Sequence, residues 1–306
     1  MSVYVFGHKS PDTDSVAAAI AFAAFNKAKG EDYVPVMQGK SNAETEMVLK
    51  RFGFSAPETM TDATGKKVAL VDHSDLAQAP DNLGAGELVA VVDHHKIGDV
   101  TTNQPIFFFN MPVGCSCTVL KILYDLEGVK IDPKVAGIML AAILSDTVNF
   151  KSPTCTEADK KAVKELKEIA GLQDTDELFM EMLKAKSAVA GVPAMDLLHR
   201  DYKDFDMNGK KVGVGQLELA TLDQVAQMRD ALYEAMKTQK GGERHSVLLM
   251  LTDVVKEGTD LMVISDDNDL IEKAFDNKLS GNSMWIDGMM SRKKQTIPNL
   301  QKAFGC

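Results

Sequence analysis

Residues 3–16 read VYVFGHKSPDTDSV, a short apolar run followed by one histidine and two aspartates. The run VYVF predicts a β-strand, and the alanine-rich stretch after residue 15 predicts a helix. Glycine, serine and proline alone would make the turn between the two elements. His8, Asp12 and Asp14 are not needed for that turn, so we interpret them as candidates for chemistry.

The same alternation of strand-like and helical patterns continues through the first half of the chain. Further strand-like runs are DYVPVMQ, VALVD, ELVAVVD and PIFFFN, and further helical patterns are SNAETEMVLKRFGF, SCTVLKILYDLEG and DPKVAGIMLAAILSD. This alternation is typical of a parallel sheet covered by helices on both faces. The sequence therefore predicts an α/β fold of the doubly wound class.

Several residues predict where helices begin. Ser15 has the side chain of an N-cap for the first helix. Ser41 and Glu44 have the spacing of a capping box at the start of the second. Pro133 fits the first position of a later helix, directly after Asp132.

The pattern changes near residue 190, which predicts two domains. The segment VAGVP, residues 189–193, is small and rich in helix breakers, and we interpret it as a linker. Beyond it, Asn208-Gly209 predicts a hairpin turn, and strand-like runs then alternate with short helical patterns. The expected division is a larger domain of residues 1–188 and a smaller α/β domain with a mixed sheet of residues 194–306.

Composition narrows the class of protein. The chain has 306 residues, of which 45% are hydrophobic, enough for a substantial core. Its net charge of −10 argues against a main function in binding nucleic acid or an anionic membrane. No run of about 18 apolar residues and no leader pattern occur, so we expect a soluble cytoplasmic protein. Cys115 and Cys117 are expected to pack near a helix start.

Three of the strand-like runs end in histidine or aspartate. VYVFGH ends at His8, VALVDH at Asp72 and His73, and VAVVDHH at His94 and His95. The carboxyl ends of parallel strands share one edge of the sheet, and open α/β folds bind ligands at that edge. These side chains are therefore expected to lie together.

Together these residues predict a centre with two metal ions. The candidate ligands are His8, Asp12, Asp14, Asp72, His94 and Asp146, the last at the end of an apolar helical run. Imidazole with carboxylate suits Mn²⁺, Co²⁺ or Fe²⁺. Crowded carboxylates repel one another unless a cation lies between them. Six ligands exceed the needs of one ion and suffice for two ions that share bridging carboxylates. His73 and Asp93 are expected to orient ligands rather than bind metal.

The motifs GHKSPDTDS, VDHS, VDHHK and SDT resemble the four N-terminal motifs of the DHH phosphoesterase superfamily. The segment SRKKQ, residues 291–295, narrows the resemblance to the family II, manganese-dependent inorganic pyrophosphatases. Nuclease branches of the superfamily carry a glycine-rich stretch with a histidine near the C-terminus instead. The resemblance covers essentially the whole chain, although Ser74 stands where family members often have asparagine. There is no room for a regulatory nucleotide-binding insert, so regulation by adenine nucleotides is not expected.

The resemblance implies an active site in the cleft between a DHH domain and a smaller DHHA2-like domain. It implies Mn²⁺ as the resident metal, with Co²⁺ or Mg²⁺ as substitutes and further Mg²⁺ or Mn²⁺ entering with the substrate. One ion would be held by His8, Asp12, Asp72 and Asp146, and the other by Asp14, Asp72, His94 and Asp146. Pyrophosphate would be cleaved to two orthophosphates by a hydroxide between the ions, and the protein would be a homodimer through its N-terminal domain.

The resemblance also implies residues that act on the substrate. They are Asp14 as proton acceptor, His95 beside the bridging or leaving oxygen, and Lys203, Arg292 and Lys293 on the phosphates. Lys210 and Lys211 lie close to Lys203 in the sequence and remain alternatives to it.

Two other functions stay open at this point. A DHH phosphodiesterase acting on short oligonucleotides or cyclic dinucleotides would use the same metal cluster. A metal-dependent binding or scaffold protein without turnover would also hold metal, although burying so much charge repulsion without chemistry is costly. An arginine–lysine pair in the second domain favours a substrate with a terminal phosphate over a nucleotide, and the intact ligand set argues against a protein without turnover.

Overall fold

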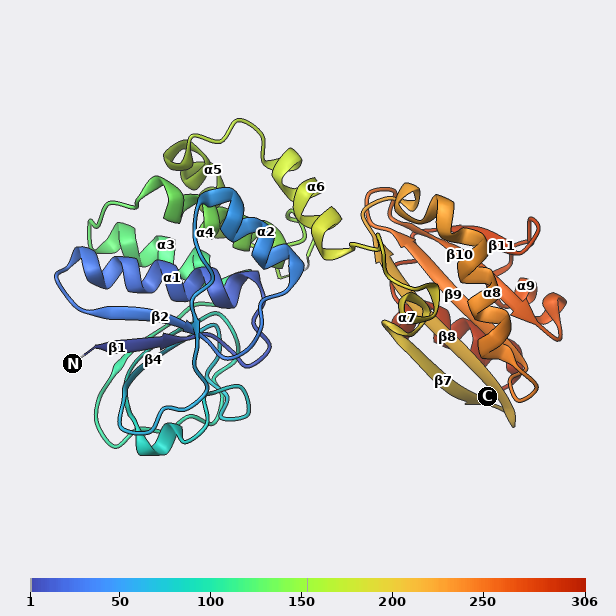
Figure 1. Cartoon of the computed structure of the whole chain (residues 1–306), viewed down its shortest axis with the longest axis horizontal. Coiled ribbons are helices and arrows are strands. Elements are labelled where there is room, and N and C mark those ends of the chain that lie inside the picture. Colours follow the sequence, from blue (N-terminus) through green and yellow to red (C-terminus); the bar gives the residue numbers. More distant parts are fainter. Residues whose placement is uncertain (1, 153) are drawn as a thin grey trace. The chain divides into compact units, whose positions relative to one another are not determined.

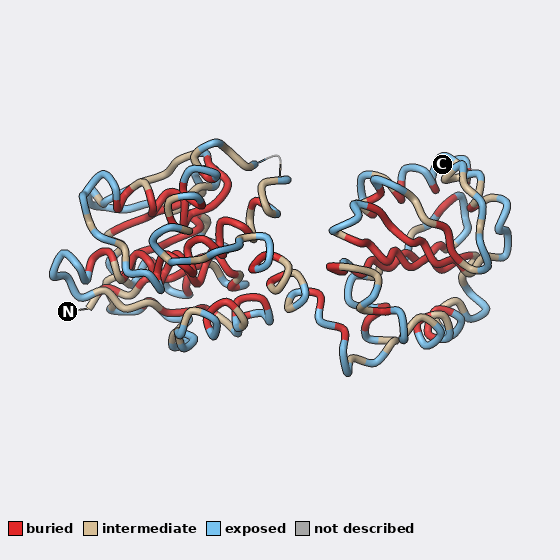
Figure 2. The backbone as a smooth tube through the Cα atoms, turned by 90° about the horizontal axis from the view of Figure 1, so that it is seen from above, coloured by how far each residue is buried: buried red, intermediate tan, exposed pale blue. Residues whose placement is uncertain are grey.

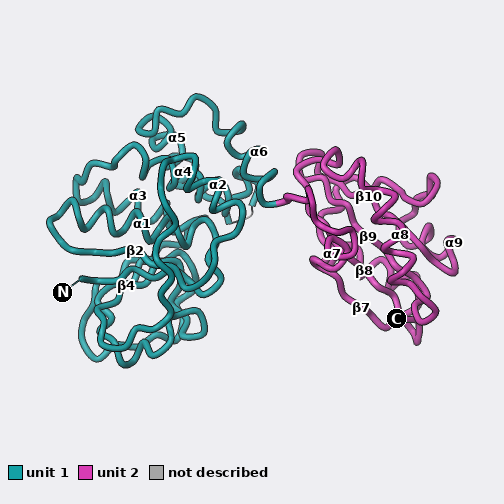
Figure 3. The backbone as a smooth tube through the Cα atoms, in the orientation of Figure 1, with its two compact units in different colours: residues 1–186 teal, residues 187–306 magenta. Residues whose placement is uncertain are grey.

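The computed structural model describes residues 2–152 and 154–306. The chain divides into two compact units, Met1–Lys186 and Ser187–Cys306 (Figure 3). Each unit is built around its own sheet and its own apolar core (Figure 2).

The first unit holds a six-stranded parallel sheet, as the sequence predicts. Its strand order is β3-β2-β1-β4-β5-β6. The strands are β1 (Val3–Phe6), β2 (Tyr33–Met37), β3 (Glu58–Thr59), β4 (Lys67–Val71), β5 (Glu87–Asp93) and β6 (Phe107–Asn110). The central strands read as continuous apolar runs because both faces of the sheet are covered.

The helices of this unit gather on one face of the sheet (Figure 1). They are α1 (Thr13–Ala28), α2 (Ala43–Phe52), α3 (Ser116–Leu126), α4 (Pro133–Asp146), α5 (Glu157–Ala170) and α6 (Thr175–Lys186). The expectation of helices on both faces is wrong. The opposite face is covered by loops and the 3-10 turn Leu83–Ala85. The crossover from β4 to β5 reads SDLAQAPDNLGAG, and its proline, glycines and aspartates favour turns over a longer helix.

Two predicted helix starts are wrong by one to three residues. The N-cap of α1 is Asp12 and not Ser15, because Asp12 Oδ1 accepts a hydrogen bond from the Ser15 N–H at 2.9 Å. The N-cap of α2 is Asn42 and not Ser41, because Asn42 Oδ1 accepts from the Thr45 N–H at 2.8 Å. In both helices the cap is the residue whose side-chain oxygen accepts a hydrogen bond from a free N–H group of the first turn.

The predicted start of α4 is confirmed. Asp132 is its N-cap, its Oδ1 accepts from the Lys134 N–H at 2.9 Å, and Pro133 occupies the first helical position. The helix is buried along most of its length and packs against α1. Alanine-rich faces on both helices allow this close approach, and the end of α4 at Asp146 is thereby fixed relative to α1.

The second unit holds a five-stranded mixed sheet with the order β11-β10-β9-β8-β7. The strands are β7 (Tyr202–Met207), β8 (Lys210–Leu219), β9 (Ser246–Asp253), β10 (Gly258–Ser265) and β11 (Ser283–Asp287). β8 and β9 are parallel, and the other neighbours are antiparallel. The predicted hairpin is confirmed, with Asn208 and Gly209 at φ of 54° and 77° in its turn.

Helices cover both faces of this second sheet. α7 (Ala194–His199) and α8 (Arg229–Lys240) pack on one face, and α9 (Asn268–Phe275) and α10 (Ile297–Phe304) pack on the other. A 3-10 segment, Leu222–Met228, precedes α8, and a π-helical turn, Arg292–Thr296, precedes α10. Among the described residues no helix has the length and apolar character that crossing a membrane requires.

Candidate metal centre and basic cluster

The candidate metal ligands lie where the strand order of the first sheet reverses. β1 and β4 are neighbours at the centre of the sheet, and their connections leave in opposite directions. His8 follows β1, Asp72 follows β4, and His94 follows β5, so all three lie beyond carboxyl ends of adjacent strands. Such a reversal leaves a crevice that open α/β folds use for ligands.

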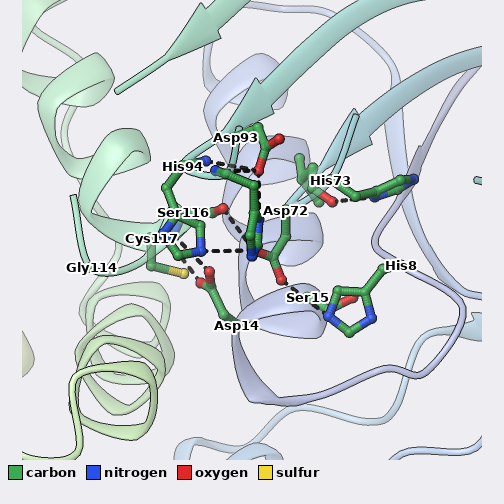
Figure 4. A network of polar contacts seen from close by, with 12 residues as sticks. His8, Asp14, Ser15, Asp72, His73, Asp93, His94, Gly114, Ser116 and Cys117 are labelled. Atoms are coloured by element: carbon green, nitrogen blue, oxygen red, sulfur yellow. Dashed lines mark hydrogen bonds and ion pairs between the residues drawn. The ribbon is translucent and has the colours of Figure 1, made fainter. Parts of the chain in front are cut away.

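One group of donor atoms comes from His8, Asp12 and Asp72. Their ligand atoms all lie within 4.8 Å of one another. His8 Nε2 is 3.4 Å from Asp12 Oδ2. It is also 3.4 Å from Asp72 Oδ2 (Figure 4). Asp12 also caps α1. Its Oδ1 accepts from the Ser15 N–H of that helix, and its Oδ2 faces His8.

A second group comes from Asp14, His94 and Asp146, whose ligand atoms also lie within 4.8 Å of one another. His94 Nε2 is 3.4 Å from Asp72 Oδ1. One oxygen of Asp72 therefore faces His8 of the first group, and its other oxygen faces His94 of the second group. Asp146 joins Asp14 and His94, and no group among the described residues places it with His8.

Asp72 is held in an uncommon backbone conformation. Its φ is 64°, in the left-handed region that residues other than glycine rarely adopt, and only 3% of its surface is exposed. Its N–H donates to the Val92 carbonyl at 3.0 Å, so β5 fixes the residue at the end of β4. Such a conformation is typical of positions that function constrains.

The carboxylates and histidines of the cluster shift one another's pKa. Burial and neighbouring carboxylates raise the pKa of Asp14 to about 6 and that of Asp146 well above its usual range. Burial acts to lower the pKa of His8 and of His94, but hydrogen bonds to carboxylates outweigh it and raise these values to about 10 and about 9. Protons on the histidines thus balance charge that a metal cation would otherwise balance.

Asp93 orients the two histidines that follow it. Its Oδ1 accepts from the backbone N–H groups of His94 and His95 at 2.8 and 3.1 Å, and lies 2.9 Å from His95 Nδ1. His94 Nδ1 is 3.0 Å from the Val113 carbonyl, which leaves Nε2 for the cluster. His73 Nδ1 is 2.9 Å from the Val71 carbonyl, and its Nε2 has no hydrogen-bond partner among the described residues, so the structure shows no hydrogen bond by which His73 would orient a ligand.

The start of α3 contributes contacts that the sequence did not reveal. The N–H groups of Ser116 and Cys117 donate to the two oxygens of Asp14 at 2.7 and 3.1 Å. Ser116 Oγ donates to Asp72 Oδ1 at 2.9 Å (Figure 4). Cys115 and Cys117 are buried at this helix start, as expected, with their thiols near Asp14. In the sequence the only indication is Ser116 itself, a short polar residue between Cys115 and Cys117 at an expected helix start.

The donor set fits manganese. All six predicted ligand residues fall in the groups described above, and they offer imidazole nitrogen and carboxylate oxygen. This mixture suits Mn²⁺ or Co²⁺ better than Ca²⁺, which takes oxygen alone.

Arg292 lies in the second unit, and its guanidinium is held by backbone and side-chain oxygens. It donates to the Asp201 carbonyl at 2.5 Å, to Asp201 Oδ1 at 2.6 Å and to the Val214 carbonyl at 3.3 Å. Lys203 pairs with Val214 in the β7–β8 ladder, which places it at the same corner of the sheet. Lys293 follows Arg292 and is exposed.

The alternative lysines lie at the other end of the hairpin. Lys210 pairs with Met207 beside the turn, and its ammonium lies 5.6 Å from the centre of the Phe304 ring. Lys211 Nζ is 3.5 Å from a carboxylate oxygen of Asp204. Lys203 is therefore the lysine of this hairpin nearest to Arg292 along the ladder.

Known proteins share both units of this chain. The DHH family N-terminal domain matches residues 2–143, and the DHHA2 domain matches residues 180–303. The chain is 55% identical to a probable manganese-dependent inorganic pyrophosphatase of Archaeoglobus fulgidus, over 99% of this chain and 98% of the relative. It is 46% identical to a manganese-dependent inorganic pyrophosphatase of Methanothrix thermoacetophila, again over 99% of this chain and 98% of the relative.

A solved structure agrees with these relatives. A crystal structure of a Methanococcus jannaschii protein assigned to the family II inorganic pyrophosphatases covers 99% of this chain and 100% of its own. The TM-score is 0.64 at 41% sequence identity. The resemblance carried by the four motifs and the SRKKQ segment is confirmed. The chain belongs to the family of manganese-dependent, family II inorganic pyrophosphatases.

Proposed function

We propose that this chain hydrolyses inorganic pyrophosphate to two orthophosphates at a pair of Mn²⁺ ions. The observation that carries the proposal is the position of Asp72, whose two oxygens face His8 and His94 of two separate donor groups. A carboxylate placed in this way suits a bridge between two ions. The names of the relatives give the substrate and the metal.

We assign the ligands to the two ions as the family resemblance implies. One would be held by His8, Asp12, Asp72 and Asp146, and the other by Asp14, Asp72, His94 and Asp146. When bound, two such ions lower the pKa of water and draw charge from phosphoryl oxygens. The contacts of Asp14 with the start of α3 and of His94 with Val113 hold these side chains in place before any ion arrives.

Two residues are assigned to proton transfer. Asp14 would accept a proton from the attacking water. His95 would donate one to the leaving oxygen, because its hydrogen bond with Asp93 raises its pKa and favours the imidazolium. The His95 side chain is 49% exposed, so a substrate has access to it.

The second unit would supply the cations that the substrate needs. Pyrophosphate is highly anionic, whereas the first unit offers mainly carboxylates and histidines at the metal centre. Lys203, Arg292 and Lys293 are assigned to the phosphates, with Arg292 as the planar fork and the lysines as point charges. The contacts of Arg292 with Asp201 fix the direction of that fork.

The proposal predicts hydrolysis that depends on a divalent metal. Protein stripped with a chelator should regain release of phosphate from pyrophosphate on addition of Mn²⁺, Co²⁺ or Mg²⁺. Mn²⁺ and Co²⁺ should bind more tightly than Mg²⁺ because the site contains imidazole. The assay is run beside a dinucleotide substrate. Cleavage of the dinucleotide with pyrophosphate left intact would show a DHH phosphodiesterase, and metal binding without either reaction would show a binding protein.

We also propose that the protein is a homodimer through its first unit. β6 is an edge strand that pairs with β5 alone among the described strands, and Phe107 and Phe108 on it are 45% and 43% exposed. An edge strand with exposed apolar side chains is prone to pair with another strand, here β6 of a second copy. Light scattering should give a dimer mass for the wild type and a monomer mass for Phe108→Lys. Val255→Lys, at an equally exposed apolar position of the second unit, should stay dimeric. A wild-type monomer at micromolar concentration would contradict the proposal.

A further inference from the structure

Glu44 is a buried carboxyl group that neither the sequence motifs nor the ligand assignment explains. It lies in the first turn of α2 and is 4% exposed. Its Oε1 accepts two hydrogen bonds, from Thr13 Oγ1 at 2.6 Å and from Ser145 Oγ at 2.5 Å. The expected capping box would have turned this side chain back onto its own helix. It instead reaches two other helices.

The two donors belong to the segments that carry metal ligands. Thr13 stands between Asp12 and Asp14 at the start of α1, and Ser145 directly precedes Asp146 at the end of α4. One oxygen of Glu44 thus joins the two helix ends that present three of the six candidate ligands. No other described hydrogen bond joins these two helix ends through a third helix.

Glu44 is itself held in place. Because Thr13 Oγ1 gives its hydrogen to Glu44, it accepts from Thr45 Oγ1 at 3.1 Å. The Thr45 N–H donates in turn to Asn42 Oδ1 at 2.8 Å, the cap of α2. Anchored in this way, the Glu44 side chain fixes the start of α1 and the end of α4 relative to α2. Both of these helices also pack against α2.

The ligands at these helix ends need such a restraint. Asp14 and Asp146 place carboxylate oxygens within 4.8 Å of each other, a separation at which two charged carboxylates repel each other. Repulsion favours separation of the end of α4 from the start of α1. A metal site tolerates only about 0.5 Å of misplacement in its ligands.

We propose that Glu44 is a positioning residue that holds Asp146 in register with Asp12 and Asp14. The inference rests on the proposed function, because it presupposes an ion shared between these helix ends. The hydrogen bonds described for Glu44 go to the hydroxyl groups of Thr13 and Ser145 and to no candidate ligand, so Glu44 acts through these two residues.

Mn²⁺ titrations of four variants test the inference. Glu44→Met keeps the length of the side chain without an acceptor, and Glu44→Gln keeps an acceptor oxygen. The same two substitutions at Glu46, an exposed residue of the same helix, are the matched controls. Electron paramagnetic resonance of free Mn²⁺ gives stoichiometry and affinity, and the spin coupling of bound Mn²⁺ reports on paired ions. Thermal unfolding measures stability separately.

Wild-type protein should bind two coupled ions. Glu44→Met should bind at least one of them roughly 10- to 100-fold more weakly, the range for a residue that orients ligands, and should lose the coupled signal. Glu44→Gln should recover most of the affinity, and both Glu46 variants should match the wild type. If Glu44→Met fails to fold, Ser145→Ala removes only the bond toward Asp146 and should weaken binding in the same direction.

The outcomes separate the inference from the proposed function. Wild-type protein that binds a single ion would overturn the two-ion proposal and this inference with it. Wild-type protein that binds two ions, with equal affinity and coupling in a folded Glu44→Met or Ser145→Ala variant, would overturn the inference alone.

Discussion

Asp72→Asn should lower both Mn²⁺ occupancy and pyrophosphate hydrolysis by several orders of magnitude while the fold persists. The Asp72 oxygens lie 3.4 Å from His8 Nε2 and 3.4 Å from His94 Nε2, so its loss affects both donor groups. Asparagine replaces one oxygen with an amide NH₂, which donates hydrogen bonds and cannot bind a cation. It also tolerates the left-handed φ of 64° at this position. Metal titration, steady-state kinetics and circular dichroism measure the three quantities.

His73→Gln is the matched control, because it changes the adjacent residue of the same motif. His73 Nδ1 lies 2.9 Å from the Val71 carbonyl, and the residue belongs to none of the donor groups. The loss of activity should stay within roughly the 10- to 100-fold range of a residue outside the ligand set. Equal losses for Asp72→Asn and His73→Gln would show that the division between ligands and supporting residues is wrong.

The strand ends were predictable because they depend on local pattern. A short apolar run followed by histidine or aspartate predicts both a strand and the position of a functional side chain at the end of that strand. Parallel pairing then brings His8, Asp72 and His94 together, whatever the details of the loops. This is why the candidate ligands could be named from the sequence.

Contacts between distant residues were not predictable in the same way. Ser116 meets Asp72 across 44 positions, and Glu44 meets Ser145 across 101. No local pattern encodes such pairs, since they arise only when whole helices pack. For Glu44 the local pattern was misleading. The spacing of Ser41 and Glu44 predicts a capping box, but the Glu44 side chain accepts hydrogen bonds from two other helices instead.

The crossovers of the first sheet illustrate a third limit. Strand order determines that the connections beyond β4 run on the face opposite to α1 and α2. Whether such a connection forms a helix depends on its own residues, and the one from β4 to β5 is rich in proline, glycine and aspartate. The class of the fold was therefore predictable, and the cover of its second face was not.

Arg292→Lys and Lys293→Ala should each lower kcat/KM for pyrophosphate at least about a hundredfold, because each removes a charge-assisted contact worth roughly 2–3 kcal/mol. A lysine at 292 keeps the charge but not the planar fork that matches a phosphate. It also loses the two-point contact with Asp201 that fixes the direction of the side chain. Mn²⁺ affinity without substrate should barely change, since neither residue belongs to the metal centre.

Lys294→Ala is the control for both variants, because Lys294 is the next exposed lysine of the same SRKKQ segment. Its kinetics should match those of the wild type if the position of the charge matters and not the charge of the segment as a whole. Thermal unfolding of Arg292→Lys separates a loss of substrate binding from a loss of packing in the second unit. Wild-type kinetics in both Arg292→Lys and Lys293→Ala would contradict the assignment of these two residues of the second unit to phosphate binding. The metal centre would then have to neutralise pyrophosphate alone, which its surplus of carboxylates makes unfavourable unless additional cations arrive with the substrate.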